Sequence, residues 1–431
     1  MIRPFAHTLD NGLRVVCVEM PHLHSAELAV YLKVGARNDP KGKEGLSHFL
    51  EHILFRGTAD FGSSKAIENA FEAIGGAPNA STDSDSTCFY SRIHPDHYQR
   101  GMEIFASMVM RPLLNGVEIE KKIIAEEARE DLNENGEEIN ADTIASRLLW
   151  PNHPLGMPTI GTLESIAKIS RYDLNAHLSA FYIPSRSVLT VAGPVSSKAV
   201  FHAAVETFGA WKDSDATPPT PRVKKPRYAS KIRFVRDSDS QMTLQLAFLG
   251  ICRSDPRFMA LRLLRRIMAG GGSSRLHLRL REELGIVYSV EALIGAYEET
   301  GCVAIDMSTS PENLVQAIDV TLAELSFITQ EPIPDDELNR IRTLYLYDLE
   351  YSHDSTYELG NRYGWGELMG ITRDIEKDRQ DASKITSSDL LEVARAVFAP
   401  GNLRLVAVGP WTSAMKKQAS ALVREYEQTW Q

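Results

Sequence analysis

Cysteine is scarce in this chain of 431 residues, which holds only Cys17, Cys88, Cys252 and Cys302. The four residues lie far apart and form no Cys-x-x-Cys pair, so the spacing typical of zinc ribbons and redox-active dithiols is missing. We expect each of them to be a small buried hydrophobic residue rather than half of a disulfide or a metal ligand.

Long apolar runs are missing too, since no stretch approaches the roughly 18 residues that a membrane-spanning helix needs. There is also no excess of positive charge, because the formal net charge is −10, which argues against a nucleic-acid-binding surface. Residues 1–7 show no charged segment followed by an apolar one, as a signal peptide would. We therefore expect a cytoplasmic protein that has neither nucleic acid nor membrane as a partner.

The most informative stretch that is present reads His48-Phe49-Leu50-Glu51-His52. On an α-helix the two histidines lie on one face, one turn apart, and Glu51 reaches the same face. Imidazoles are common zinc ligands, and a carboxylate beside them can take a proton from a water molecule. We interpret His48 and His52 as ligands of one Zn²⁺ per chain and Glu51 as the general base. The alternative is an accidental pair of core histidines.

A catalytic zinc usually has three protein ligands, so two histidines leave the site one ligand short. Residues 116–134 show the pattern of a long helix on which Ile119, Ile123 and Glu127 follow in steps of four. We expect Ile123 and Ile124 to turn this face inward, where a carboxylate is costly unless it is paired or bound to a metal. Glu127 is therefore our choice for the third ligand. The alternative is an ordinary acidic helix on the surface.

Three more glutamates occur on the same helix. Glu120 precedes Glu127 by two helical turns, and we expect it to hold a ligand in place through a hydrogen bond. Glu126 and Glu130 fall off this face, and we expect them to be solvated.

The second half of the chain repeats the first. Ile169 to Leu174 corresponds to Ile385 to Leu390 at an offset of 216 residues, and Phe181 to Pro194 parallels Phe398 to Pro410. The repeat predicts two homologous domains, 1–212 and 227–431, joined by a proline-rich linker at 213–226. No His-x-x-Glu-His occurs after residue 226, so we expect the second domain to carry no metal.

These motifs resemble those of the pitrilysin, insulin-degrading enzyme and mitochondrial processing peptidase family of zinc peptidases. In that family His-x-x-Glu-His supplies two ligands and the base, and a glutamate roughly 75 residues later completes the site. Here 75 residues separate His52 from Glu127. The contexts 46–58 and 120–127 also match the family, and the chain has the size of its short bacterial members.

The resemblance implies a fold and further site residues. It implies an α+β fold, with two homologous α/β-sandwich domains whose mostly antiparallel sheets pack against helices. The edge strand formed by Asn79, Ala80, Ser81 and Thr82 would pair with the backbone of the substrate. Arg281 and Tyr288 match a pair that faces the zinc site from the other domain and would hydrogen-bond the scissile carbonyl and the developing oxyanion.

The function that follows is zinc-dependent endopeptidase activity on peptides or unfolded segments inside a clamshell chamber. Family members of this size form such a chamber from two chains, either as a homodimer or as a heterodimer with a metal-free paralogue. One alternative is a catalytic subunit that matures a specific precursor peptide, and another is a non-catalytic peptide-binding subunit. A purely structural zinc site would need a fourth protein ligand, and no cysteine or histidine is placed to supply one.

Overall fold

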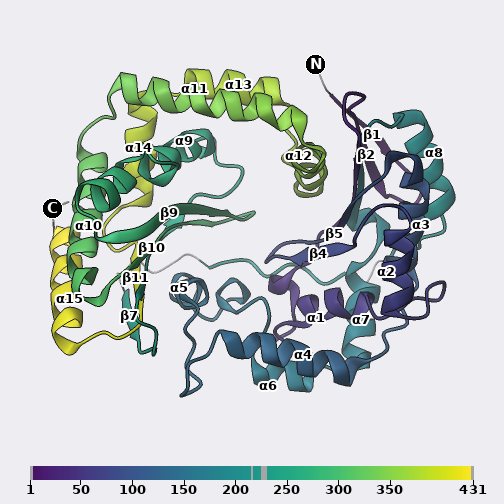
Figure 1. Ribbon diagram of the computed structural model, residues 1–431, viewed down its shortest axis with the longest axis horizontal. Helices are drawn as coiled ribbons and strands as arrows, with labels where there is room; N and C mark the ends of the chain where they lie inside the picture. Colours follow the sequence, from purple (N-terminus) through teal and green to yellow (C-terminus); the bar gives the residue numbers. More distant parts are fainter. Residues whose placement is uncertain (1–2, 215–216, 225–230, 429–431) are drawn as a thin grey trace. The chain divides into compact units, whose positions relative to one another are not determined.

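The computed structural model describes residues 3–214, 217–224 and 231–428 (Figure 1). The chain forms two compact units, each assembled from three separate segments of the sequence. Unit 1 comprises Met1–Ala128, Met157–Pro221 and Leu349–Ile375, and unit 2 comprises Arg129–Gly156, Arg222–Asp348 and Glu376–Gln431. No helix in the described part of the chain combines the length and the apolar character that crossing a membrane requires.

Unit 1 is built on a mixed sheet, which has six strands within the described residues, in the order β1-β2-β6-β3-β5-β4. Neighbouring strands run antiparallel except β2 and β6, which are parallel. The strands are β1 Pro4–Thr8, β2 Arg14–Glu19, β3 Ala26–Leu32, β4 Asn79–Thr82, β5 Thr87–Ile93 and β6 Ser187–Gly193.

Helices cover both faces of this sheet (Figure 1). α3 and α8 pack on one face, and α12 packs on the other against β2, β3 and β6. The main core of the unit lies under the first face, where Phe49, Phe71, Phe89 and Phe105 are fully buried. The helices are α1 Leu46–Leu54, α2 Ser64–Glu72, α3 Tyr98–Met110, α4 Val117–Glu130, α6 Leu163–Lys168, α7 Arg171–Phe181, α8 Ser197–Phe208 and α12 Thr356–Met369.

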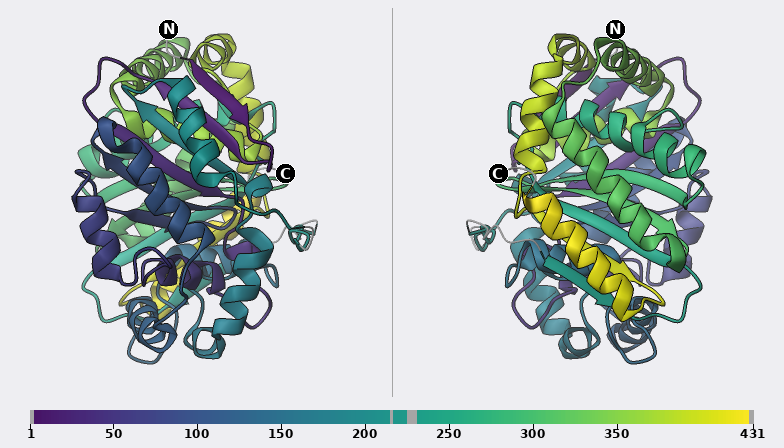
Figure 2. Two further views of the ribbon diagram at one scale, coloured as in Figure 1. Left: turned by 90° about the vertical axis from the view of Figure 1, so that its right-hand side faces the viewer. Right: turned by 90° about the vertical axis from the view of Figure 1, so that its left-hand side faces the viewer.

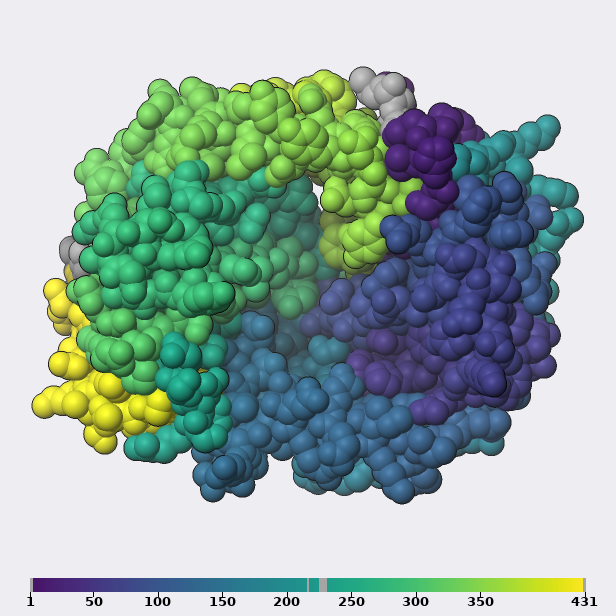
Figure 3. All heavy atoms as spheres, in the orientation of Figure 1, coloured from purple at the N-terminus to yellow at the C-terminus, as the bar shows by residue number. Residues whose placement is uncertain are grey.

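Unit 2 has a second mixed sheet, with five strands among the described residues, in the order β7-β11-β8-β10-β9. α10 and α15 lie side by side over one face (Figure 2). One side of α15 is buried at Ala419, Val423 and Tyr426, and the helix lies at the surface of the unit (Figure 3). The strands are β7 Lys231–Val235, β8 Met242–Gly250, β9 Val287–Ala296, β10 Gly301–Thr309 and β11 Leu403–Val408. The helices are α5 Ala141–Leu149, α9 Phe258–Ala269, the π-helix η5 His277–Glu283, α10 Leu314–Gln330, α11 Asp335–Tyr351, α13 Ile375–Lys384, α14 Ser387–Val397 and α15 Ser413–Gln428.

Each unit takes one helix from the other half of the sequence. α12 comes from the second half but covers the sheet of unit 1, while α5 comes from the first half and packs on β8 and β11 of unit 2. Ile144 and Leu149 of α5 share a buried cluster with Ala247 and Val406 of that sheet. The compact units therefore differ from the predicted contiguous domains, 1–212 and 227–431. α5 and α12 belong to the unit on which they pack, and the order of the sequence does not show which unit that is.

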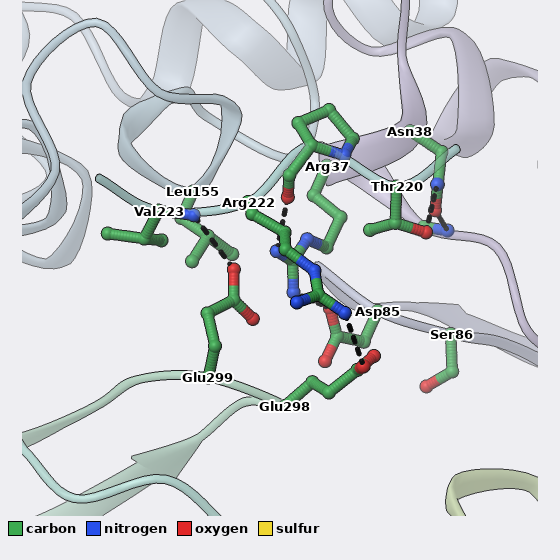
Figure 4. Close-up of polar contacts among 12 residues, drawn as sticks. Arg37, Asn38, Asp85, Ser86, Leu155, Thr220, Arg222, Val223, Glu298 and Glu299 are labelled. Atoms are coloured by element: carbon green, nitrogen blue, oxygen red, sulfur yellow. Dashed lines mark hydrogen bonds and ion pairs between the residues drawn. The ribbon is translucent and has the colours of Figure 1, made fainter. Parts of the chain in front are cut away.

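The predicted linker, 213–226, is anchored where the structure describes it; residues 215–216 and 225–226 lie outside the described residues. In unit 1, the guanidinium of buried Arg37 donates to the carbonyl of Pro221 at 2.6 Å and pairs with Asp85 at 2.8 Å (Figure 4). In unit 2, the backbone N–H of Val223 donates to Glu299 at 2.9 Å. Pro221 and Val223 are therefore held by specific hydrogen bonds.

Candidate metal centre

The helix that carries His48 and His52, α1, begins at a tightly constrained turn. Gly45 precedes the helix with φ +92°, and a Cβ at this position would lie 2.3 Å from the carbonyl oxygen of Ile160. Only glycine can adopt this positive φ easily and also leave room for the carbonyl oxygen of Ile160. The carboxylate of Asp39 then accepts hydrogen bonds from the backbone N–H groups of Gly45 at 2.8 Å and Ser47 at 2.9 Å, so it caps the start of the helix.

A buried polar network, Asp39–Ser47–His177, fixes this first turn. The Ser47 hydroxyl donates to Asp39 at 2.6 Å and lies 3.0 Å from Nε2 of His177. Burial raises the pKa of Asp39 to about 7 against the opposing effect of its hydrogen bonds, and burial lowers the pKa of His177 to about 4. No short spacing in the sequence links residues 39 and 177, so the sequence alone does not predict this network.

The structure brings together His48, His52 and Glu127, the three residues that the sequence suggested as ligands. Nε2 of His48 lies 3.7 Å from one carboxylate oxygen of Glu127, and Nε2 of His52 lies 3.8 Å from the other. One ligand atom from each residue lies within 4.8 Å of the other two. A tetrahedral zinc with bonds of about 2.0–2.2 Å sets its ligands about 3.3–3.6 Å apart, so a small inward movement would complete the site.

The chemistry of these donors also fits zinc. Two imidazole nitrogens and one carboxylate are the ligand set of several catalytic zinc sites, which keep a fourth position for water or substrate. Among the described residues, this cluster contains no fourth histidine, cysteine or acidic ligand. Burial and the nearby charge of His52 lower the pKa of His48 to about 4, which keeps His48 neutral and able to bind a metal.

Glu120 lies beside the ligands and orients one of them. Its side chain is buried, lies 3.3 Å from Nδ1 of His52 and forms an ion pair with Arg56. Burial alone would raise the pKa of Glu120, but its bonds to His52 and Arg56 hold the pKa below the usual range. With Nδ1 of His52 donating to Glu120, the lone pair of Nε2 faces Glu127.

The pKa of His52 results from opposing effects. Burial by itself would lower it, but the hydrogen bond to Glu120 and the negative charges of Glu51, Glu120 and Glu127 raise it above the usual value. This excess of negative charge around an imidazole is what a bound divalent cation would neutralise.

Glu51 lies on α1 between the two histidines in sequence and is almost fully buried. Its carboxylate accepts a hydrogen bond from the hydroxyl of Thr82 on β4. Burial raises the pKa of Glu51, although the hydrogen bond from Thr82 and the charge of His52 oppose the shift. A carboxyl group with a raised pKa and a fixed position is suited to accept a proton and return it.

The structure corrects one expectation about α4, because Ile123 does not turn inward. Glu120, Ile124 and Ala128 form the buried row of this helix, while Ile123 is 43% exposed. Glu127 lies on the exposed row with Ile123, and its side chain is 45% exposed. The choice of Glu127 thus rested on a wrong premise about its face, yet Glu127 is the residue that meets both histidines. Glu126 and Glu130 are exposed, as expected.

The predicted substrate-binding segment, Asn79 to Thr82, forms β4 at the edge of the sheet of unit 1. Among the described strands β4 pairs only with β5, so its other edge has no strand partner and can accept an added strand. The backbone N–H of Ala80 donates to the side chain of Asn79 at 2.9 Å. Asn79 and Ser81 are exposed, whereas Ala80 packs against the core. The short strand therefore combines an open edge with a direct contact to Glu51 through Thr82.

Arg281 and Tyr288 belong to unit 2, and their approach to the zinc site stays a prediction. Arg281 lies in the π-helix η5 and Tyr288 in β9, and both side chains are exposed. A π-helix is rare and is often found at functional sites. The 81% exposure of Tyr288 is unusual for a large aromatic residue in a strand.

Comparisons with known proteins agree with this geometry. Residues 14–163 match the family model described as insulinase (peptidase family M16), and residues 168–345 match the one described as peptidase M16 inactive domain. The uncharacterized zinc protease YmxG of Bacillus subtilis is 28% identical over 396 residues, which cover 91% of this chain and 95% of that protein. The uncharacterized zinc protease SCO5738 of Streptomyces coelicolor is 28% identical over 427 residues, covering 96% and 91%.

Solved structures show the same fold at lower identity. A protease from Helicobacter pylori superposes with a TM-score of 0.87 at 22% identity, covering 95% of this chain and 100% of that one. A structure titled peptidase M16 inactive domain, from Pseudomonas fluorescens, superposes with a TM-score of 0.86 at 20% identity, covering 95% and 98%. With both halves matched in order and the paired histidines and glutamate in place, this chain belongs to peptidase family M16, the insulinase family, as a short member of the bacterial type.

Proposed function

We propose that this protein is a zinc-dependent endopeptidase. The observation that carries the proposal is the convergence of His48, His52 and Glu127, from two separate helices, beside the buried carboxylate of Glu51. Relatives across nearly the whole chain are named zinc proteases, which supports the same reading. A non-catalytic peptide-binding subunit would have no need of this complete set.

The residues of the site divide the work of peptide hydrolysis. Bound zinc would polarise the scissile carbonyl and lower the pKa of a water molecule in its open position to about 7. Glu51 accepts the proton of the attacking water and returns a proton to the leaving amine. The hydroxyl of Thr82 keeps the Glu51 carboxylate in place, and Glu120 keeps the imidazole of His52 oriented.

The substrate would bind to β4 as an added antiparallel or parallel strand, with backbone hydrogen bonds to Asn79–Thr82. By resemblance to the family, Arg281 and Tyr288 would stabilise the oxyanion that forms at the scissile carbonyl. A chamber formed by two chains, identical or paralogous, would admit peptides and unfolded segments, including a precursor peptide of a maturation pathway.

The decisive test replaces Glu51 with glutamine. Glu51→Gln should keep one zinc per chain and lose hydrolysis of a quenched fluorescent peptide by about 100-fold or more, because only the proton acceptor is removed. Zinc is counted by elemental analysis, and a chelator should abolish the activity of the unmodified protein. Glu68→Gln, an exposed glutamate on α2, is the matched control and should change neither quantity.

Two results would contradict the proposal. Loss of zinc from Glu51→Gln would make Glu51 a ligand instead of the base. A zinc-loaded protein that binds peptides but hydrolyses none of them would support a non-catalytic peptide-binding subunit.

A further inference from the structure

Unit 1 holds a cavity of about 750 Å³ on the face of the sheet that α12 covers. Its walls come from β3 and β5, from the start of β4 and from the segment that leads into α12. The metal ligands do not line this cavity, although Asn79 of the edge strand does. The cavity therefore adjoins the proposed substrate strand without being part of the catalytic site.

The floor of the cavity carries a buried carboxylate. Glu27 of β3 is only 5% exposed. Among the described residues, none forms a hydrogen bond or an ion pair with its carboxyl group. Burial raises the pKa of Glu27 to about 7, and only the more distant charge of Arg92 opposes the shift. An ionised carboxylate that is buried without a partner destabilises the fold, and a cation that enters the cavity would offset this cost.

The register of the strands places the lining residues on one face. In the strand register, Glu27 of β3 lies opposite Arg92 of β5. Tyr90 of β5 lies two residues before Arg92 and opposite Asn79 of β4. Because side chains alternate along a strand, Glu27, Arg92, Tyr90 and Asn79 all point to the same side of the sheet. Arg92 is exposed, so its guanidinium can remain in solvent while the cavity is filled.

Two aromatic rings and a second carboxylate complete the walls. The rings of Tyr90 and Tyr357 lie 5.9 Å apart with an angle of 53° between their planes, and Tyr357 is half-exposed at the start of α12. Tyrosine faces attract ammonium and guanidinium groups. Asp354 adds an exposed carboxylate, so two acidic groups face the single guanidinium of Arg92.

The cavity also lies within reach of a bound peptide. Asn79 lines it at one end of β4, and Thr82, three residues on, contacts the general base Glu51. Three residues of extended chain span about 10 Å. A peptide added along β4 would thus present its residue three or four positions from the cleaved bond to the mouth of the cavity.

We propose that this cavity binds a positively charged group of the substrate peptide, with Glu27 as the counter-ion and Tyr90 and Tyr357 as the walls. The inference rests on the proposed function, because it uses the peptide bound along β4. The cation is either a lysine or arginine side chain or the amino terminus of the peptide, and both have the same chemistry here.

The test measures binding, so it does not depend on hydrolysis. A labelled, N-acetylated peptide with norleucine at every variable position is compared with peptides that carry one lysine at each position in turn, and with the same peptide with a free amino terminus. Each is titrated at pH 8, above the pKa of Glu27, against zinc-loaded Glu51→Gln protein. One lysine position, or the free amino terminus, should lower Kd about tenfold or more, as a charge-assisted hydrogen bond does.

The preference should disappear in the double variant Glu51→Gln/Glu27→Gln and persist in Glu51→Gln/Glu68→Gln. Tyr357→Ala, which removes an exposed ring, provides a second route and should reduce the ratio of the Kd of the norleucine peptide to the Kd of the preferred cationic peptide. Equal binding of all peptides, or a preference that survives Glu27→Gln, would refute the inference. Failure of the zinc-loaded, unmodified protein to cleave any peptide of the series would count against the proposed function instead.

Discussion

At the scale of single residues, Glu127 is the proposed ligand that brings a second helix to the site. It is the only one of the three that comes from α4, and its side chain is 45% exposed. An exposed carboxylate stays hydrated when it is ionised, so it avoids most of the desolvation cost that a buried carboxylate would have. It can therefore approach the two imidazoles in its charged form. Its neighbours Glu126 and Glu130 are exposed on the same helix and provide matched comparisons.

We expect Glu127→Gln to weaken zinc binding by more than about 100-fold, the upper figure for losing a residue that merely hydrogen-bonds a ligand. Glu126→Gln and Glu130→Gln should bind zinc as the unmodified protein does. Competition with a chromogenic chelator measures all three affinities. If either control lost zinc while Glu127→Gln kept it, the third ligand would have to be reassigned.

How far the sequence predicts the site depends on how local each arrangement is. His48, Glu51 and His52 follow from one helical turn, and the position of Thr82 follows from a strand that the sequence also predicts. Glu127 was found through helical spacing together with the resemblance. Asp39 with His177, and Glu27 with Tyr357, meet only after the sheet and its helices have packed, so no spacing in the sequence announces them.

At the scale of elements, α12 is held unusually close to its sheet by glycine. A Cβ on Gly364 would lie 2.3 Å from Oγ1 of Thr190 and 2.5 Å from the ring of Tyr31, both of which are buried. A Cβ on Gly360, one turn earlier, would make only ordinary contacts, the nearest at 3.6 Å to Ala192. Alanine at these two positions should therefore have opposite effects on the free energy of unfolding.

Gly364→Ala should destabilise the protein by about 1–3 kcal/mol, the usual cost of overpacking a core. Gly360→Ala should be neutral or should stabilise it by up to about 1 kcal/mol, because alanine favours a helix over glycine. Urea unfolding followed by circular dichroism measures both variants. Equal stability of the two would mean that α12 does not lie as close to Tyr31 and Thr190 as the structure places it.

The sequence predicts that residues 357–381 are helical but not how the helix is used. The structure ends α12 at Met369, next to Gly370 with φ +68°, and α13 begins at Ile375. Helical periodicity identifies such segments locally. Which sheet a helix covers is decided by shape, here by the fit of Gly364 against Tyr31 of β3 and Thr190 of β6. Helical periodicity carries no information about such a fit.

At the scale of the whole molecule, the repeat found in the sequence reappears as matching topology. The order β2-β6-β3-β5-β4 in unit 1 corresponds to β7-β11-β8-β10-β9 in unit 2, and the first pair of each series is parallel. The free edge strand β4 thus has β9 as its counterpart, and β9 carries Tyr288. Unit 1 contains the three proposed metal ligands, while unit 2 contains the exposed side chains of Arg281 on its π-helix and Tyr288 on its edge strand.

This division of labour predicts that metal binding and turnover can be separated by one substitution. All three proposed zinc ligands lie in unit 1, so Arg281→Ala in unit 2 should leave the zinc content at one per chain. If Arg281 stabilises the oxyanion, kcat should fall by about 100-fold, as it does when one such donor is removed elsewhere. Arg279→Ala is the matched control, since Arg279 is exposed on the same π-helix and pairs with Glu283. Turnover that is equal in the two variants would exclude Arg281 from the reaction, whereas a loss confined to Arg281→Ala would show that unit 2 takes part in the chemistry for which unit 1 holds the metal.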